Sequence, residues 1–147
     1  MKKLILIATI AVAAAFTANA QSFEKISEIL DSEEVNLAQI SYMAGTCGFN
    51  LPENSNYTTA FEEMKRRRFF KQDAKESDKA TLAQASYVFM KAAKMDGGLM
   101  YKITDSKRYA FKELKARGVI PQTAEASLPL SGHDAINLLN SCISEAK

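Results

Sequence analysis

Tryptophan is absent from the chain, and histidine occurs once, as His133. Glycine and proline are scarce, with 6 and 3 residues, which favours helices. No second histidine and no cysteine stands close to His133 in sequence to complete a metal or catalytic site. We therefore interpret His133 as a solvated residue near a helix start, with a catalytic or metal role as the alternative. We expect no metal and no cofactor.

Other signatures of catalysis are missing as well. The pair Gly97 and Gly98 lacks the lysine and the spacing of a phosphate-binding loop. Glu62 and Glu63 are followed four residues later by arginines, so solvated ion pairs explain these carboxylates. The sequence thus predicts that the protein is not an enzyme. A small hydrolase would need a polar cleft that no pattern here indicates.

Long hydrophobic runs are limited to the N-terminus. Two lysines precede an apolar run over residues 4–16, and Ala18, Asn19 and Ala20 form an A-x-A cleavage site. This pattern is typical of a secretory signal peptide over residues 1–20, cleaved after Ala20. A membrane anchor is the alternative, but the run is shorter than the ~20 residues of a spanning helix. We predict a periplasmic or secreted protein without a transmembrane segment in the mature chain.

Charge of one sign does not dominate either. Without Lys2 and Lys3, the basic residues equal the 17 acidic ones, so net charge gives no argument for nucleic acid. Nucleic acid is not an expected partner. Residues 21–147 suffice for one domain with its own core. The frequent Ala, Leu, Lys and Glu favour helices.

What the chain does contain is an internal repeat. LAQISYM at Leu37 returns as LAQASYV at Leu82, and AFEEMKRRRFF at Ala60 returns as AFKELKARGVI at Ala110. A period of this length indicates paired helices that pack against neighbouring pairs. We predict an all-α fold of paired helical repeats in units of about 36–80, 81–130 and 131–147. Three apolar inner helices pack centrally and amphipathic outer helices cover them.

Cap residues predict where the inner helices start. Asn36, Thr81 and Ser131 are each followed three residues later by Gln or Asp, the spacing of a capping box. A short helix over residues 23–30 precedes the first unit.

Glycines predict two of the helix ends. Gly97 and Gly98 are expected to end the second inner helix, and Gly118 the second outer helix. Arg68 stands at the position of Gly118 in the first unit, so a looser exit is expected there.

The two cysteines, Cys47 and Cys142, occupy the same position of the repeat, where the second unit has Ala92. Export and repeat equivalence favour a disulfide between them, provided that their Cα atoms lie within ~7 Å. Two buried free thiols are the alternative. A redox-active pair is disfavoured because the cysteines are not in a C-x-x-C arrangement.

The second unit carries further short motifs in a recognisable order. An Asp precedes a Tyr–Ala pair and a helix that ends in Gly and two aliphatic residues, before the next capped helix; these are Asp105, Tyr109, Ala110, Gly118, Val119 and Ile120. In this order the chain resembles surface-layer homology (SLH) repeats, which implies a helical fold and a setting in the bacterial cell envelope. That family binds cell-wall polysaccharide through an Arg at the start of the inner helix. Leu37, Leu82 and Gly132 stand there instead, so glycan binding by that contact is not implied.

The most charged segment is KRRRFFKQDAK, residues 65–75. Its cations, Lys65, Arg66 and Arg67, are candidates for binding an anionic glycan, a lipid headgroup or an acidic partner. The alternative is the exposed end of an outer helix, where cations favour the helix dipole. The Phe69–Phe70 pair is expected to turn inward.

Two repeat-equivalent arginines are further candidates. Arg67 and Arg117 each follow a glutamate by four residues, which favours a structural salt bridge. The alternative is that both line grooves between units and bind anions there. We expect a non-enzymatic envelope binding or assembly module that contacts peptidoglycan, envelope polysaccharide or an envelope protein. A periplasmic protein-interaction adaptor is the alternative.

Overall fold

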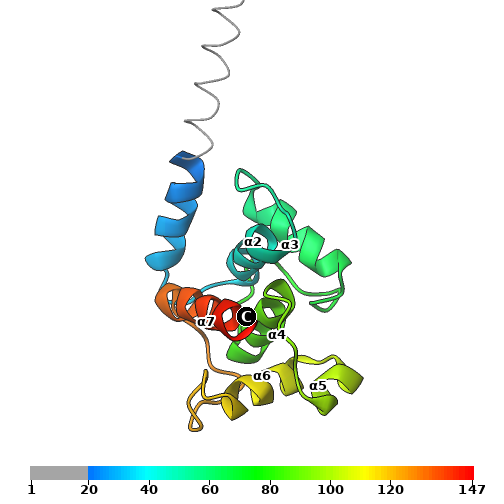
Figure 1. Cartoon of the computed structure of the whole chain (residues 1–147). Coiled ribbons are helices and arrows are strands. Elements are labelled where there is room, and N and C mark those ends of the chain that lie inside the picture. The colour runs from blue at the N-terminus through cyan, green and yellow to red at the C-terminus, as the bar shows by residue number, and fades with distance from the viewer. Residues whose placement is uncertain (1–19) are drawn as a thin grey trace, which may run out of the picture.

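The computed structural model describes residues 20–147 (Figure 1), so the predicted signal peptide over residues 1–20 lies almost entirely outside the described part. The described chain is all-helical, as predicted, and its extended pairing is limited to two isolated bridges, Asn36 with Lys79 and Thr81 with Pro129. Residues 20–30 form a helix that contains the expected segment 23–30. The helices that follow are α2 (Leu37–Gly48), α3 (Tyr57–Arg66), α4 (Leu82–Ala92), α5 (Leu99–Thr104), α6 (Lys107–Ala116) and α7 (Gly132–Glu145). Within this range, no helix combines the length and apolarity needed to cross a membrane.

All three predicted inner-helix starts are confirmed. The Asn36 side chain accepts from the Gln39 backbone N–H at 2.8 Å, and the Gln39 side chain accepts from the Asn36 N–H at 3.0 Å. Thr81 and Gln84 form the same reciprocal box at the start of α4. Ser131 caps α7 by accepting from the backbone of Asp134. These hydrogen bonds satisfy backbone donors of the first turn, which have no partner within the helix.

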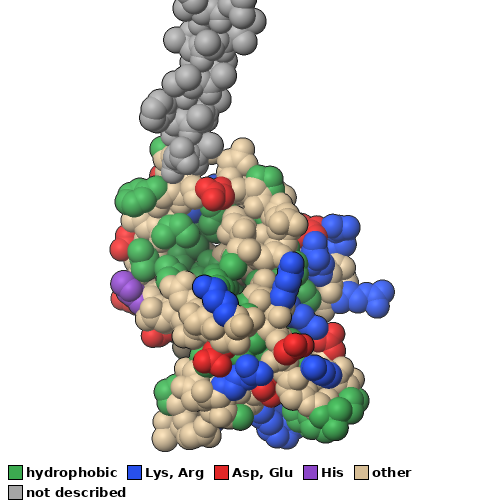
Figure 2. Space-filling view, in the orientation of Figure 1, with side chains coloured by type: hydrophobic (Ala, Val, Ile, Leu, Met, Phe, Trp, Pro, Cys, Tyr) green, Lys and Arg blue, Asp and Glu red, His purple; other side chains and the backbone are tan. Residues whose placement is uncertain are grey.

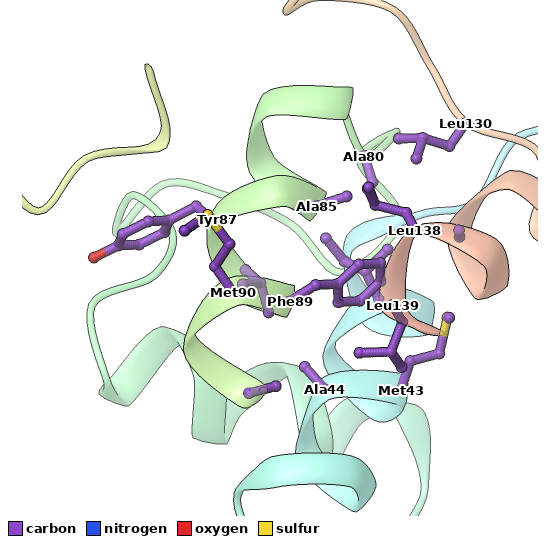
Figure 3. Packing of buried hydrophobic residues seen from close by; sticks show 14 of the residues in the cluster. Met43, Ala44, Ala80, Ala85, Tyr87, Phe89, Met90, Leu130, Leu138 and Leu139 are labelled. Atoms are coloured by element: carbon purple, nitrogen blue, oxygen red, sulfur yellow. The ribbon is translucent and has the colours of Figure 1, made fainter. Parts of the chain in front are cut away.

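Helix α4 lies at the centre of the packing, against α2, α6 and α7. Its Val88, Phe89 and Met90 are fully buried. Figure 3 shows Phe89 reaching toward Leu138 and Leu139 of α7. A helix apolar around most of its circumference needs neighbours on several sides, and these three helices supply them.

Backbone hydrogen bonds join successive units at positions that the repeat makes equivalent. The first two N–H groups of α2 donate to a loop that follows α3, and those of α4 donate to a loop that follows α6. The pairs are Leu37 to Asp78 (2.9 Å), Ala38 to Glu76 (3.1 Å), Leu82 to Leu128 (2.7 Å) and Ala83 to Ala126 (3.0 Å). The same pattern of backbone contacts thus occurs at the starts of α2 and α4.

The N-terminal segment supplies the corresponding contact for α7. Gly132, the first residue of α7, donates to the Ser32 carbonyl at 2.9 Å. A Cβ at Gly132 would lie 1.6 Å from the Ile29 carbonyl oxygen, so only glycine fits this approach. The segment before α2 thus contacts the start of α7 as the loops after α3 and α6 contact the starts of α2 and α4.

Three residues that directly precede the N-caps meet at the core. The Val35 N–H donates to the Leu130 carbonyl at 2.8 Å, and the Ala80 N–H donates to the Val35 carbonyl at 2.9 Å. All three residues are buried, and Figure 3 shows Ala80 beside Leu130. The starts of the inner helices are therefore held together by backbone contacts as well as by side-chain packing.

Helix α7 presents a polar face where the other inner helices are covered. His133, Asn137 and Asn140 are exposed. The equivalent positions in α2 and α4 are all buried: Ala38, Tyr42 and Gly45, and Ala83, Tyr87 and Met90. A polar outer face of this kind is typical of a capping repeat. The exposure of His133 agrees with its interpretation as a solvated residue.

The predicted end of the second inner helix was wrong. Helix α4 ends at Ala92, and Lys94 takes the left-handed conformation, with φ of 54°. Gly98 instead starts α5, a helix that the sequence pattern did not predict. Helix α4 is thus shorter at its C-terminal end than its apolar composition indicated.

The expectation of a looser exit after α3 was also wrong. Arg68 has φ of 65°, close to the 75° of Gly118. The Phe69 N–H donates to the Met64 carbonyl at 3.1 Å, as the Val119 N–H donates to Leu114 at 2.9 Å. The same left-handed turn ends both outer helices, and in the first unit a non-glycine residue adopts it.

Candidate binding grooves between the units

A groove of about 470 Å³ runs between the end of the first unit and the second unit; we call it groove I. Its lining residues come from α2, α4, α6 and the segment after α3: Leu37, Arg68, Phe69, Phe70, Lys71, Asp73, Ala74, Asp78, Gln84 and Lys107. Phe69 is fixed from two sides, with its ring 5.5 Å from that of Phe49 and 5.6 Å from that of Tyr87. The adjacent backbone at Arg68 and Lys71 is therefore held by packed aromatic rings.

A second groove, of about 280 Å³, lies between the second unit and α7; we call it groove II. Its lining residues are Leu82, Val119, Ile120, Pro121, Leu128, Pro129, Leu130, Asp134, Asn137, Leu138 and Ser141. Six of these correspond by repeat position to lining residues of groove I, since Leu37, Phe69, Phe70, Lys71, Asp78 and Gln84 align with Leu82, Val119, Ile120, Pro121, Leu128 and Asp134. The two grooves are equivalent in position and differ in chemistry.

Groove I carries three cations. Arg68, Lys71 and Lys107 line it and make no salt bridge within residues 20–147. Of its two carboxylates, that of Asp78 accepts from the Lys75 backbone N–H at 2.9 Å and so stabilises a turn. The side chains left free to bind a ligand are mostly cationic. Groove II has Asp134 as its charged lining residue and is otherwise largely apolar.

Local structure explains where the three cations point. Arg68 follows α3 in the left-handed turn, and Lys71 follows Phe70, which is buried. The predicted inward turn of the aromatic pair is thus confirmed for Phe70, whereas Phe69 is partly buried. Lys107 is the first residue of α6 and faces the groove from the second unit.

The candidate Lys65 is held by the protein itself. Its Nζ donates to the Ala74 carbonyl at 3.3 Å and lies 5.6 Å from the centre of the Phe61 ring. The equivalent Lys115 donates to the Ala124 carbonyl at 2.8 Å. This ammonium group anchors the segment after the outer helix in both units.

Arg66 is the most exposed of the candidate cations, with 76% of its side chain accessible. It pairs with Glu63 on the same helix. Lys65 and Arg66 both line a shallow hollow of about 750 Å³ along α3. An exposed ion pair of this kind contributes little to stability, so Arg66 can exchange its partner for a ligand.

Arg67 and Arg117 make the ion pairs that their spacing predicted. Their Nε atoms lie 2.7 Å from Glu63 and 2.9 Å from Glu113. The Arg67 guanidinium also lies 4.6 Å from the centre of the Phe49 ring, and Arg117 donates to the Asp96 carbonyl. Neither arginine is among the residues that line grooves I and II.

The ion pairs shift the titration of both glutamates. Hydrogen bonds from Arg66 and Arg67 hold the pKa of Glu63 below its usual range. Burial raises the pKa of Glu113, but hydrogen bonds from the Gly98 N–H and from Arg117 outweigh it, so the pKa is lowered overall. Both carboxylates are therefore stabilised in their charged form.

The predicted disulfide is absent, and both cysteines are free thiols. Cys142 is fully buried, whereas Cys47 is exposed near the end of α2. The neighbouring Gly48, not Cys47, faces α4, since a Cβ at Gly48 would lie 2.0 Å from the Ala92 carbonyl oxygen. Equivalent repeat positions did not bring the sulfurs together, because the Cys47 side chain is exposed whereas that of Cys142 lies in the core.

Burial raises the pKa of both thiols, and raises that of Cys142 to about 12. Neither thiol has the depressed pKa of a reactive cysteine. Within residues 20–147, no three His, Cys, Asp or Glu side chains are grouped so that they could hold a metal ion.

The sequence pointed to the basic segment 65–75, which contains Arg68 and Lys71, but the candidates chosen within it were Lys65, Arg66 and Arg67. Lys107 lies elsewhere in the sequence, and no sequence pattern marks it as a binding residue.

Comparison with known proteins adds no relative: no family model, no curated protein and no solved structure matches this chain.

Proposed function

We propose that the chain is an exported, non-enzymatic binding or assembly module of the bacterial cell envelope. Its ligand is an anionic envelope polymer, peptidoglycan or an envelope polysaccharide. The observation that carries the proposal is groove I, which is lined by three cations that make no salt bridge among the described residues, Arg68, Lys71 and Lys107, together with the partly exposed ring of Phe69.

This combination suits an acidic polysaccharide. Carboxylate or phosphate groups on the polymer pair with Arg and Lys, while the apolar faces of its sugar rings pack on Phe69 and Ala74, which are partly exposed in the groove. Gln84 supplies a further polar group in the same groove. The hollow along α3, which Lys65 and Arg66 line, also carries Glu62 and Glu63, so the candidate cationic surface is that of groove I.

The resemblance to SLH repeats supports the same position. Leu37 and Leu82, which stand where that family carries its glycan-binding Arg, line grooves I and II. In groove I the cations come instead from the segment after α3 and from α6. Gly132, the third such position, has no room for a side chain.

Co-sedimentation with purified peptidoglycan and with envelope polysaccharide tests the proposal. We expect binding at low salt that weakens as salt screens the cations. Absence of binding to either polymer at low salt would contradict the proposal.

A periplasmic protein-interaction adaptor is the second candidate, and groove II favours it. Its apolar lining includes Leu128, which is 43% exposed, and such a surface suits an apolar segment of a partner protein. Crosslinking in intact cells separates the two candidates. Specific protein adducts through groove II, without polymer binding, would select the adaptor.

A further inference from the structure

Helix α5 is a feature of the second unit alone. The first unit connects α2 to α3 without a helix, whereas the second unit inserts α5 between α4 and α6. The inter-unit backbone contacts described above do not involve α5. An insertion that the repeat does not need is a candidate for a separate role.

The outer face of α5 is apolar and exposed. Leu99, Met100 and Ile103 are 73%, 48% and 69% accessible. Figure 2 shows hydrophobic side chains gathered at the lower right, over the position that α5 occupies in Figure 1. Three large aliphatic side chains on six residues make an apolar patch in contact with water.

The helix is fixed in this orientation. Tyr101 is buried beneath it, and the Gly98 N–H at its start donates to Glu113 of α6 at 3.0 Å. One face of α5 is therefore attached to the rest of the protein, and the apolar face points to solvent.

Positive charge surrounds the patch. Asp96 pairs with Lys102, and Asp105 pairs with Lys91. Lys94 and Arg108, which flank α5 in the chain, make no salt bridge within residues 20–147. The local excess of charge is therefore cationic and complements an anionic surface.

The size of the patch argues against a protein interface. Three partly accessible side chains on a six-residue helix expose far less than the ~800 Å² that each partner buries in a standard complex. A lipid surface needs no matching shape and combines apolar insertion with attraction of Lys and Arg to headgroups. We propose that α5 docks the protein on an anionic lipid surface, with Leu99, Met100 and Ile103 entering the headgroup region.

This inference is independent of polymer binding in groove I. Its test is sedimentation of the purified protein with vesicles of phosphatidylglycerol and phosphatidylcholine, compared with phosphatidylcholine alone. The double variant Leu99→Ser, Ile103→Ser removes apolar surface on α5. The matched control is Phe23→Ser, Ile26→Ser, because both side chains are exposed on the helix of residues 20–30. Residues 1–20 are the same in all variants, so any contribution from them cancels in the comparison.

We expect the wild type and the control variant Phe23→Ser, Ile26→Ser to bind the anionic vesicles and to bind the neutral ones more weakly. The double variant should partition at least about tenfold less, because the lost burial of two aliphatic side chains acts on the partition constant. Circular dichroism confirms that the variants remain folded. Equal partition of the double variant and the wild type, or no binding of the wild type to anionic vesicles, would overturn the proposal. So would loss of self-association as the only effect of the double variant, which would assign the patch to a second copy.

Discussion

At the scale of single residues, the left-handed turn after each outer helix is occupied by Arg68 in the first unit and by Gly118 in the second. A left-handed conformation costs an ordinary residue ~1–2 kcal/mol, and glycine avoids this cost. We expect Arg68→Gly to raise the free energy of unfolding by ~1 kcal/mol and Gly118→Ala to lower it by about the same amount. Urea denaturation of both variants measures the effect. If Arg68→Gly instead lowers the free energy of unfolding, the contacts of the Arg68 side chain stabilise the fold by more than the left-handed conformation of its backbone destabilises it.

The two cysteines differ in accessibility and therefore in reactivity. Cys47 is exposed, whereas Cys142 is buried with its pKa raised to about 12, so it stays protonated at neutral pH. We expect iodoacetamide at pH 8 to modify one thiol in the native protein and two after denaturation. Mass spectrometry counts the modified thiols. If the native protein is not modified and takes up two labels only after reduction, Cys47 and Cys142 form a disulfide in solution.

Residues whose structure is set by near neighbours were predictable, and others were not. Capping by Asn36 and Thr81 involves a residue three positions away, so the sequence carried the whole signal. The conformation of Arg68 depends on burying Phe70 further along the chain, which overrides the local preference for glycine. The direction of the Cys47 side chain depends on how closely Gly48 approaches α4, and a sequence alignment of the repeats cannot predict such a distance.

At the scale of elements, α5 is joined to α6 by Glu113, which accepts from the Gly98 N–H and pairs with Arg117. The folded-state pKa of Glu113 is lowered, so its contribution to stability is present above the unfolded-state pKa of ~4.3. That contribution is lost as pH falls through the lower folded-state pKa. We expect Glu113→Gln to reduce the free energy of unfolding at pH 7 and to have a smaller effect at pH 3.

Urea denaturation across pH 3 to 7 tests this dependence. Glu62→Gln is the matched control, since Glu62 makes no salt bridge within residues 20–147. The same deficit for Glu113→Gln at pH 3 and pH 7 would show that the ion pair is not the source of the effect.

Helix α5 and the end of α4 also mark the limit of prediction from element patterns. The segment after α4 contains two glycines, which favoured a loop, and a six-residue helix is too short to show amphipathic periodicity. The long apolar stretch before it predicted a longer α4, but the turn at Lys94 ends the helix earlier. The strongly periodic outer helices α3 and α6 were predicted correctly because one face of each is buried.

At the scale of the whole molecule, the segment before α2 packs against the start of α7. The contact at Gly132 leaves no space for a Cβ next to the Ile29 carbonyl, which belongs to the backbone and cannot move aside. We expect Gly132→Ala to lower the free energy of unfolding by ~3 kcal/mol, the upper end for overpacking. Gly45→Ala is the control, because its Cβ would meet the flexible end of the Leu51 side chain at 2.9 Å.

Denaturation of both glycine variants compares the two contacts. A Gly132→Ala protein as stable as Gly45→Ala would show that the N-terminal segment does not pack against α7 in solution.

The grooves between units were anticipated only in outline. The repeat indicated that units meet along grooves, and the basic segment 65–75 indicated where cations gather. Which cations face the groove depended on tertiary contacts, since Lys65 turns back to the Ala74 carbonyl while Arg68 and Lys71 line groove I. The difference in chemistry between the two grooves arises from substitutions at equivalent positions, such as Lys71 and Pro121.

The central claim is that groove I binds an anionic envelope polymer, and one comparison of equally charged variants tests it. The triple variant Arg68→Gln, Lys71→Gln, Lys107→Gln removes the groove cations, whereas Lys75→Gln, Lys112→Gln, Lys147→Gln removes as many exposed cations outside grooves I and II. Both are measured by co-sedimentation with peptidoglycan and envelope polysaccharide at low salt. We expect the groove variant to bind whichever polymer the wild type binds at least about tenfold more weakly, since each charge-assisted contact contributes ~1.5–3 kcal/mol. The control variant should bind nearly as the wild type does. Equal losses in both variants would contradict a specific site in groove I.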